Sequence, residues 1–152
     1  MKLSTRSRYG TRLMLDMAEH HQEGPIQLRA IAKRQNIPPK YLEQIIIPLK
    51  KAGYVTSVRG YKGGHMLAKH PREITTGEIV AVLEGGRRLT VCADDPEACE
   101  RAGTCATRWL WKEAIEAMYE RLDAVTLADL VVIVRSLEKD GDLDRICDEE
   151  QG

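Results

Sequence analysis

Residues 28–68 of this chain read LRAIAKRQNIPPKYLEQIIIPLKKAGYVTSVRGYKGGHMLA, and this stretch decides the fold. Apolar residues recur at helical spacing over residues 28–35, which predicts a short helix. Residues 36–38 (NIP) form a tight connector, and Pro39 suits the first turn of a second helix that should run to Ala52 and stop at a glycine. Two short helices joined in this way are typical of a helix-turn-helix, whose second helix lies in the major groove of DNA.

A basic hairpin follows this helical pair. Residues 54–58 (YVTSV) predict a strand, residues 59–64 (RGYKGG) a turn, and residues 65–68 (HMLA) the returning strand. A helical pair alone is common in proteins that never meet DNA, but a basic hairpin directly after it indicates a β-wing. Such a wing can place Arg59 beside phosphates or in the minor groove. The turn lacks the spacing of a nucleotide-binding loop and opens no helix, which disfavours that site.

Helices are expected on both sides of this core stretch. Apolar periodicity predicts a first helix over residues 5–22, and Thr75 with Glu78 forms a capping box for a helix that Gly85 closes. A long helix should follow from Ala106, and Thr126 should cap a last one. The fold class is therefore mainly α with a small β-wing. We expect four parts: a winged helix-turn-helix domain (1–84), a cysteine loop (85–105), dimerisation helices (106–138) and an acidic flexible tail (139–152).

Charge divides the chain in two although its net charge is zero. Residues 1–72 hold 14 Lys and Arg against 4 Asp and Glu, a net charge of +10, and residues 73–152 balance it with −10. This asymmetry favours a nucleic-acid-binding head joined to a regulatory or oligomerising body, although two solvated faces of one domain would give the same count. No apolar run approaches the roughly 20 residues that span a bilayer, so we expect a soluble, cytoplasmic protein without a membrane partner.

Three cysteines lie close together after the predicted wing. Cys92, Cys99 and Cys105 have the spacing C-x6-C-x5-C, which matches neither a zinc knuckle nor a plant-type ferredoxin. Thiolates are soft ligands, so the group indicates bound iron or zinc, with a reversible disulfide switch as a weaker alternative. A tetrahedral metal ion needs four ligands, so three thiolates leave one coordination position to be filled. The possible fourth ligands to weigh are Cys147, Arg108, Glu43, His20, His21, His65 and His70.

The long helix carries more apolar surface than one face needs. Trp111, Ile115, Met118 and Leu122 form a seven-residue seam along it. A small domain covers one apolar face by itself, so this extra seam predicts a homodimer. Burial of the seam against the head is the competing interpretation.

Several motifs in order resemble the IscR/NsrR superfamily of dimeric winged-helix transcription regulators, many of which carry a 2Fe-2S cluster. The resemblance covers nearly the whole chain and rests on MKLS at 1–4 with Arg8-Tyr9, YLEQ at 41–44, LKKAG at 49–53, SVRG at 57–60 with KGG at 62–64, and TLADL at 126–130. It implies that Cys92, Cys99 and Cys105 hold a 2Fe-2S cluster. It also implies a homodimeric repressor bound to a double-stranded DNA operator.

The fourth ligand departs from the family's patterns. Some members use a histidine three residues after the last cysteine, but Arg108 stands there, and a guanidinium offers no lone pair. Other members use a carboxylate near the start of the first helix, where this chain has Arg8. Glu43 is our leading candidate, with a purely DNA-contacting or surface role as its alternative. Cys147 has better ligand chemistry but lies beside the acidic tail.

The winged-helix interpretation also predicts the DNA contacts. Gln44 can pair with adenine through its amide, and Glu43 can accept from cytosine N4. The other expected contacts are Lys40 and Tyr41 at the start of the same helix, Arg59 in the minor groove with Gly60 beside it, and Ser4, Arg6, Lys50 and Lys62 at phosphates. For each of these four phosphate candidates, a purely solvated surface position is the alternative.

The sequence thus predicts a dimeric transcription regulator whose operator binding depends on a 2Fe-2S cluster and reports cluster supply, iron or redox state. One alternative is a redox or electron-transfer protein that uses the winged helix as an interaction module. Another is a DNA-binding regulator with a structural zinc site or a thiol switch. No paired carboxylates, Ser-His relay or phosphate loop stands out, which disfavours an enzyme.

Overall fold

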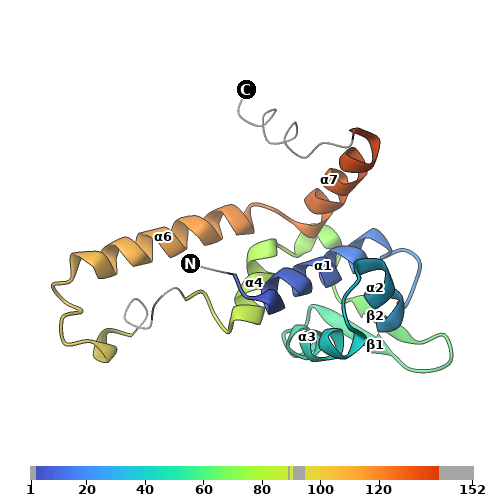
Figure 1. The fold of residues 1–152 in the computed structure, drawn as a ribbon, viewed down its shortest axis with the longest axis horizontal. Coiled ribbons are helices and arrows are strands. Elements are labelled where there is room, and N and C mark those ends of the chain that lie inside the picture. Colours follow the sequence, from blue (N-terminus) through green and yellow to red (C-terminus); the bar gives the residue numbers. More distant parts are fainter. Residues whose placement is uncertain (1–2, 89, 91–94, 141–152) are drawn as a thin grey trace.

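The computed structural model describes residues 3–88, 90 and 95–140, and it confirms a mainly helical fold with a two-stranded antiparallel sheet (Figure 1). The elements are α1 (Thr5–Glu19), α2 (Leu28–Gln35), α3 (Pro39–Lys51), β1 (Val55–Val58), β2 (Gly64–Leu67), η1 (Pro71–Glu73), α4 (Thr76–Glu84), η2 (Pro96–Ala98), α6 (Ala106–Asp123) and α7 (Leu127–Asp140). Among these described helices, none has the length and apolar character to cross a membrane.

Local side-chain bonds decide where α1 begins and ends. The Ser4 hydroxyl accepts from the Ser7 backbone N–H at 3.0 Å and caps the first turn. The helix ends at Glu19 and not at residue 22 as the apolar pattern predicted. Beyond Glu19 the Nδ1 atoms of His20 and His21 lie 2.8 Å from the carbonyl oxygens of Asp16 and Ala18. These rings bond carbonyls of the last helical turn, so the chain can leave the helix early.

The turn between α2 and α3 is the tight connector that the sequence predicts, and Asn36 begins it. Asn36 adopts a left-handed conformation with φ of 50°, which asparagine tolerates better than most residues, and its N–H bonds the Ala32 carbonyl. Pro39 opens α3, where a missing backbone N–H costs nothing. The helix then continues through Pro48 to Lys51.

The hairpin of β1 and β2 is anchored to the turn after α1. Val55 pairs with Leu67 and Val58 with Gly64 in the antiparallel register. Ile26 forms an isolated bridge to His65, with N···O distances of 2.9 and 2.8 Å. A Cβ at Gly64 would lie 2.5 Å from the Ile26 carbonyl oxygen, so this position requires glycine. Strand β2 of the wing is therefore fixed to the segment between α1 and α2.

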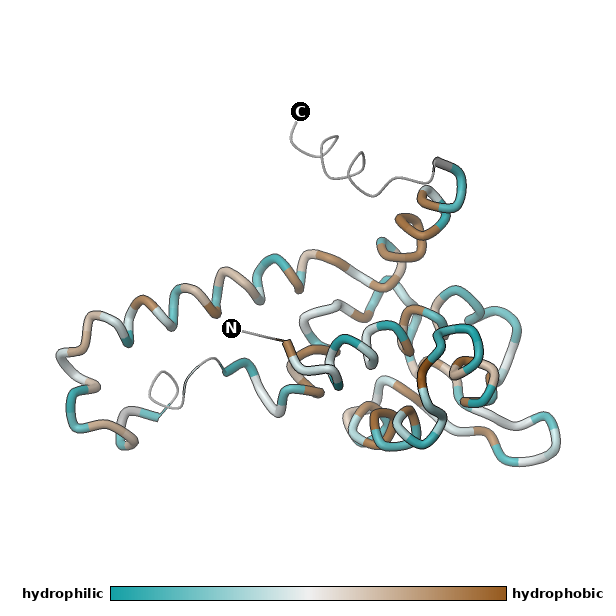
Figure 2. Tube along the Cα trace, in the orientation of Figure 1, coloured by the Kyte–Doolittle hydropathy of each residue, from teal (hydrophilic) through white to brown (hydrophobic). Residues whose placement is uncertain are grey.

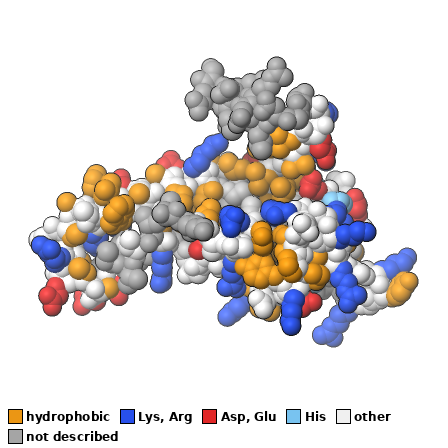
Figure 3. Space-filling view, in the orientation of Figure 1, with side chains coloured by type: hydrophobic (Ala, Val, Ile, Leu, Met, Phe, Trp, Pro, Cys, Tyr) orange, Lys and Arg blue, Asp and Glu red, His pale blue; other side chains and the backbone are white. Residues whose placement is uncertain are grey.

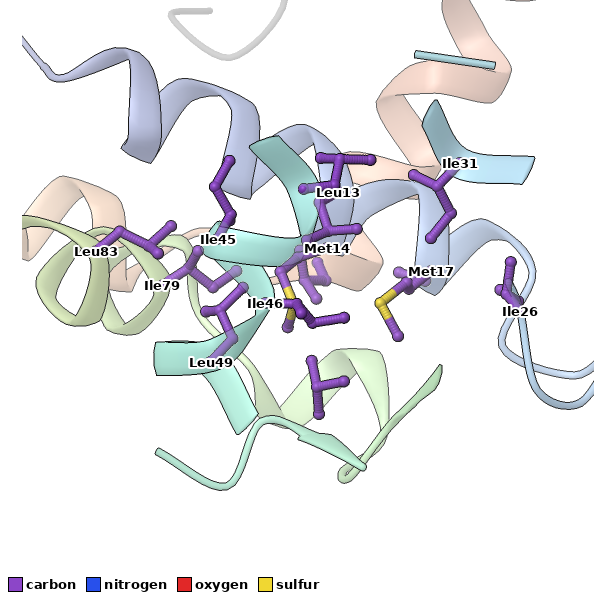
Figure 4. Close-up of a cluster of buried hydrophobic side chains, with 14 of the residues drawn as sticks. Leu13, Met14, Met17, Ile26, Ile31, Ile45, Ile46, Leu49, Ile79 and Leu83 are labelled. Atoms are coloured by element: carbon purple, nitrogen blue, oxygen red, sulfur yellow. The ribbon is translucent and has the colours of Figure 1, made fainter. Parts of the chain in front are cut away.

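The core forms where α1 packs against α3 and α4. Leu13, Met14 and Met17 of α1 are fully buried, together with residues of α3 and α4 (Figure 4). A Cβ at Gly10 would collide with the Leu83 side chain, so glycine lets α1 approach α4 closely. The remaining buried members of this cluster are Ala18, Ile26, Ile31, Ala32, Ile37, Leu42, Ile45, Ile46, Leu49, Val55, Ile74, Ile79 and Leu127.

The two last helices leave this core in different ways. α6 extends away from the head, whereas α7 turns back and packs against α1 and η1 (Figure 1). Backbone hydrogen bonds from Thr76 to Val125 and from Leu127 to Ile74 fix the junction between them. Apolar and polar residues alternate along the projecting part of α6 (Figure 2). The expected tail at 139–152 lies outside the described residues from residue 141 onward.

A buried ion pair joins α1 to α2. Asp16 is fully buried and accepts from Arg34 at 3.0 and 2.5 Å and from the Gln35 amide at 3.0 Å. Burial alone would raise the pKa of Asp16, but the hydrogen bonds from Arg34 and Gln35 outweigh it and hold that pKa below its usual range. The charged carboxylate is therefore part of the packed head.

We expect Asp16→Asn to lower the free energy of unfolding at pH 7 by about 1–3 kcal/mol, because the amide loses charge-assisted bonds to Arg34. The folded pKa of Asp16 lies below the unfolded value of about 4, so the stabilisation is present above pH 4 and lost as pH falls through the folded pKa. Urea unfolding at pH 7, 4 and 3.5 should show the difference shrinking. Exposed Glu113→Gln is the control and should change stability by less than about 0.5 kcal/mol. A difference that does not depend on pH would contradict the ion-pair account.

Candidate functional site

The outer face of α3 carries the residues that the sequence assigns to DNA bases. Lys40, Glu43 and Gln44 are all exposed, whereas Leu42 and Ile45 on the opposite face are fully buried. The helix period of 3.6 residues thus separates a packing face from a polar face. Their exposure leaves the polar side chains accessible to a partner.

Tyr41 has a structural role as well as an expected DNA contact. Its ring is half-buried and meets Tyr9 of α1 edge to face, with ring centroids 5.8 Å apart. The Arg12 guanidinium lies 5.6 Å from the centroid of Tyr9 on the same helix. This aromatic contact holds the first turn of α3 against α1 and fixes the direction of the polar face.

The wing presents its positive charges to solvent. Arg59, Gly60 and Lys62 are exposed, and Gly60 has a φ of 115°, which the turn requires and which other residues rarely adopt. Between the two strands, one pair before the turn, Ser57 Oγ lies 3.1 Å from His65 Nδ1. Burial, and then the charge of Lys50, lowers the pKa of His65, which favours its neutral form. The positive potential of this hairpin therefore comes from its tip.

The start of α1 is already occupied by an internal carboxylate. Glu84 Oε1, from the end of α4, accepts from the Ser4 backbone N–H at 3.0 Å and from the Ser7 hydroxyl at 2.5 Å. Burial raises the pKa of Glu84, but the bonds from Ser7 and Ser4 outweigh burial and lower it. Ser4, expected at a DNA phosphate, thus uses its N–H and its hydroxyl in hydrogen bonds within the chain. Arg6 is exposed. Sequence reasoning missed Glu84 because its partners are far away along the chain.

Two of the three clustered cysteines can be described. Cys99 follows η2 and Cys105 caps the start of α6; both are partly exposed free thiols. Cys105 Sγ lies 3.2 Å from Thr107 Oγ1. This contact, followed by the Arg108 backbone N–H, lowers the pKa of Cys105. A thiol at a helix start is more readily a thiolate, which is the form that binds metals.

The described part of the loop does not complete a metal site by itself. Cys92 and Cys147 lie outside the described residues, and among the described ones no three His, Cys, Asp or Glu side chains come together as metal ligands. The loop reaches the free end of α6, well away from α3 (Figure 1). Within one chain, the helix that carries Glu43 therefore does not approach Cys105.

The start of the cysteine loop, which we call the loop root (residues 84–88), is bound to α6 by Arg87. Arg87 forms a bidentate ion pair with Asp123, with N···O distances of 2.6 and 2.9 Å, and its guanidinium lies 4.7 Å from the centroid of the Tyr119 ring. Three residues earlier, Glu84 holds the start of α1. The segment that leads into the cysteine loop thus contacts both the first turn of α1 and the long helix α6.

The apolar seam of α6 divides into two parts. Ile115 is buried against Val80 of α4, and Met118 and Leu122 pack partly against the same small cluster. This is the burial against the head that the sequence left open as an alternative. Trp111 remains exposed, beside Trp109 with 65% of its surface exposed. Hydrophobic side chains gather at this free end of α6 (Figure 3).

An apolar groove lies at the other end of α6. It has a volume of about 460 Å³ and lies between α1, α4 and the junction of α6 with α7. Its apolar lining consists of Leu3, Leu15, Val80, Leu122, Val125 and Leu130. One molecule thus exposes both an apolar projection and an apolar groove.

Comparisons with known proteins agree with this geometry. Residues 3–133 match the Rrf2 family, described as an iron-dependent transcriptional regulator. The protein rrf2 of Nitratidesulfovibrio vulgaris is 47% identical over 131 residues, which cover 86% of this chain and 87% of that protein.

Two solved structures have the same fold. The IscR structure from T. potens has a TM-score of 0.73 and 40% identity and is covered over 88% of each chain. The structure of CymR, the global cysteine regulator of B. subtilis, has a TM-score of 0.72 and 41% identity over 88% of this chain and 98% of that one. These matches confirm the winged-helix fold and the resemblance found in the sequence. The chain belongs to the Rrf2 family of DNA-binding transcription regulators.

Proposed function

We propose that the protein is a homodimeric regulator whose binding to a DNA operator is controlled by a 2Fe-2S cluster on Cys92, Cys99 and Cys105. The observation that carries this proposal is the loop root, where Glu84 bonds the start of α1 and Arg87 bonds α6. A change in the cysteine loop can therefore reach the DNA-reading head through direct contacts.

Operator reading would combine the polar face of α3 with the wing. Gln44 and Glu43 supply an amide and a carboxylate for base edges in the major groove, and Lys40 lies at the start of the same face. Arg59 with Gly60 would enter the minor groove, while Arg6, Lys50 and Lys62 neutralise phosphates. Because Glu84 holds Ser4, we give Ser4 the smaller role of orienting this surface.

The residues that would hold the cluster suit it chemically. Cys99 and Cys105 are free, and the pKa of Cys105 is lowered towards the thiolate form that iron requires. When bound, a 2Fe-2S group supplies a redox-sensitive centre whose presence reports cluster supply, iron or oxidants. Glu43 stays our candidate for the fourth ligand, and this role is the alternative to its contact with a base. Because α3 lies far from the loop in one chain, Glu43 would have to come from the other subunit (Figure 1).

The change in operator affinity would be transmitted by two sets of contacts at the loop root, which involve Glu84 and Arg87. Ordering of the loop would favour the Glu84 bonds to α1 and the Arg87 bonds to α6, and so one relative pose of the two reading heads. This requires different operator affinities in the two states of the loop. A relative named as a cysteine regulator and the lowered pKa of Cys105 favour a second candidate, a thiol switch at the same loop.

The homodimer would join the free end of one α6 to the apolar groove of a second copy. Trp109, Leu110 and Trp111 are large apolar side chains exposed at that end. Burying one such side chain gains about 1.5–3 kcal/mol, and the groove offers matching apolar surface. The exchange is reciprocal, as a two-fold symmetric dimer requires.

We expect Gln44→Ala to weaken binding to the preferred operator by about 1–3 kcal/mol while binding to random DNA stays unchanged, because only the specific complex uses the amide. Electrophoretic mobility shifts at fixed salt measure both affinities. Gln22→Ala, also an exposed glutamine, is the matched control and should leave both affinities unchanged. Equal losses of affinity for operator and random DNA would show that Gln44 makes no base-specific contact. Absence of any sequence preference in every redox state would favour the redox-protein alternative.

Cys105→Ala should abolish iron and acid-labile sulfide in protein purified without oxygen, because it removes one of three thiolate ligands. Visible absorption and metal counts per chain measure this, and Cys147→Ala should retain both if Cys147 is not the fourth ligand. Zinc with no colour in the wild-type protein would favour a structural site. Metal-free wild-type protein would favour the thiol switch.

Trp109→Glu should convert the dimer into a monomer, because the shorter charged side chain loses the apolar contact that the indole would make with Leu15, Val80 and Leu130. Sedimentation equilibrium over a range of protein concentrations measures the change. Glu116→Gln, at an exposed position on the same helix, should leave the dimer intact. A Trp109→Glu protein that stays dimeric would place the interface elsewhere.

A further inference from the structure

Ile47 is an apolar side chain on the polar face of the reading helix. It is 63% exposed, whereas the adjacent Ile45 is fully buried and Ile46 is 4% exposed. The same residue type therefore occurs three times in a row, twice in the core and once outside it. Packing within this chain accounts for the first two and not for the third.

The helix geometry places Ile47 directly behind the base-reading pair. At 100° per residue, position 47 lies between positions 43 and 44 in angle and one turn further along α3. Both Glu43 and Gln44 are exposed, so the three side chains share one surface. A rise of 1.5 Å per residue puts Ile47 about 4.5 Å beyond Gln44 along the axis, which is the length of one to two base-pair steps.

The chemistry of the major groove offers few apolar partners. Its floor presents hydrogen-bond donors and acceptors, and the C5-methyl group of thymine is the apolar feature of an unmodified base pair there. A branched aliphatic side chain facing a polar base edge would desolvate that edge without a hydrogen bond, which is unfavourable. An aliphatic side chain that faces the major groove would therefore favour thymine over the other bases.

We propose that Ile47 is a specificity-determining residue that packs against a thymine C5-methyl group, one or two base pairs from the base that Gln44 reads. This inference rests on the proposed DNA-binding function and adds one element of the operator's sequence. The apolar groove that we assign to the dimer is lined by residues of α1, α4, α6 and α7 and the segments beside them, and not by α3, so the dimer does not account for Ile47.

Deoxyuridine tests the contact because it removes only the methyl group from thymine. Wild-type protein, handled without oxygen, first selects its preferred duplexes from a pool with a randomised core. Each thymine of the selected sequence is then replaced in turn by deoxyuridine, and the affinities are measured at one salt concentration. At one position next to the Gln44 base we expect a three- to fivefold loss, since one methyl group contributes about 0.8 kcal/mol.

Ile47→Ala should bind the thymine duplex more weakly than wild type and should show no further loss with deoxyuridine at that position. Ile47→Val keeps a branched methyl pair and should retain part of the sensitivity. The matched control is Val132→Ala on α7, whose side chain is 62% exposed, and it should keep the full deoxyuridine effect. Thermal unfolding should show all three variants folded, because both positions are on the surface.

Three outcomes would overturn the assignment. Wild-type protein could bind every deoxyuridine duplex as well as its thymine parent, or Ile47→Ala could keep the wild-type sensitivity. In both cases sequence-specific binding itself would stand, so the failure would concern Ile47 alone. Selection of no preferred sequence at all would instead defeat the proposed function together with this inference.

Discussion

The close packing of α1 against α3 and α4 is the constraint on which the other parts depend. Leu13, Met14 and Met17 are fully buried at this junction, and Gly10 lets α4 come near enough for Leu83 to pack. Interiors packed this densely transmit a displacement of one helix to its neighbours. The direction of the polar face of α3 is therefore fixed relative to α4, which leads into the cysteine loop.

The position of that loop gives a regulatory signal a short path. Glu84 at the end of α4 bonds the first turn of α1, and Arg87 pairs with Asp123 of α6. In the proposed regulation, a signal at the loop between these two contacts would act on the head and on α6 together. The proposed regulation thus requires only contacts that the folded chain already makes, together with two states of the loop that differ in operator affinity.

Local patterns predicted most of the elements. Apolar periodicity gave the helices, Pro39 the start of α3, and Thr75 with Glu78 the cap of α4, in which the Glu78 N–H donates to the Thr75 hydroxyl at 3.2 Å. The end of α1 was placed too late, because the bonds of His20 and His21 to carbonyl oxygens near the helix end cannot be read from an apolar pattern. The seam of α6 was seen as one surface, although Ile115 packs on α4 and Trp111 does not pack there.

By itself the sequence determined the helix-turn-helix with its wing, the charge division and the candidate ligand and DNA-contacting residues, because these follow from spacing and residue chemistry over short distances. Only the tertiary structure decided which groups are free to act. In the folded chain Ser4 is hydrogen-bonded to Glu84, and the helix that carries Glu43 lies away from the cysteine loop. Ile47 remains exposed on the same face as Gln44. The physical reason is that burial and pairing depend on residues far apart in the chain, which meet only when the helices pack.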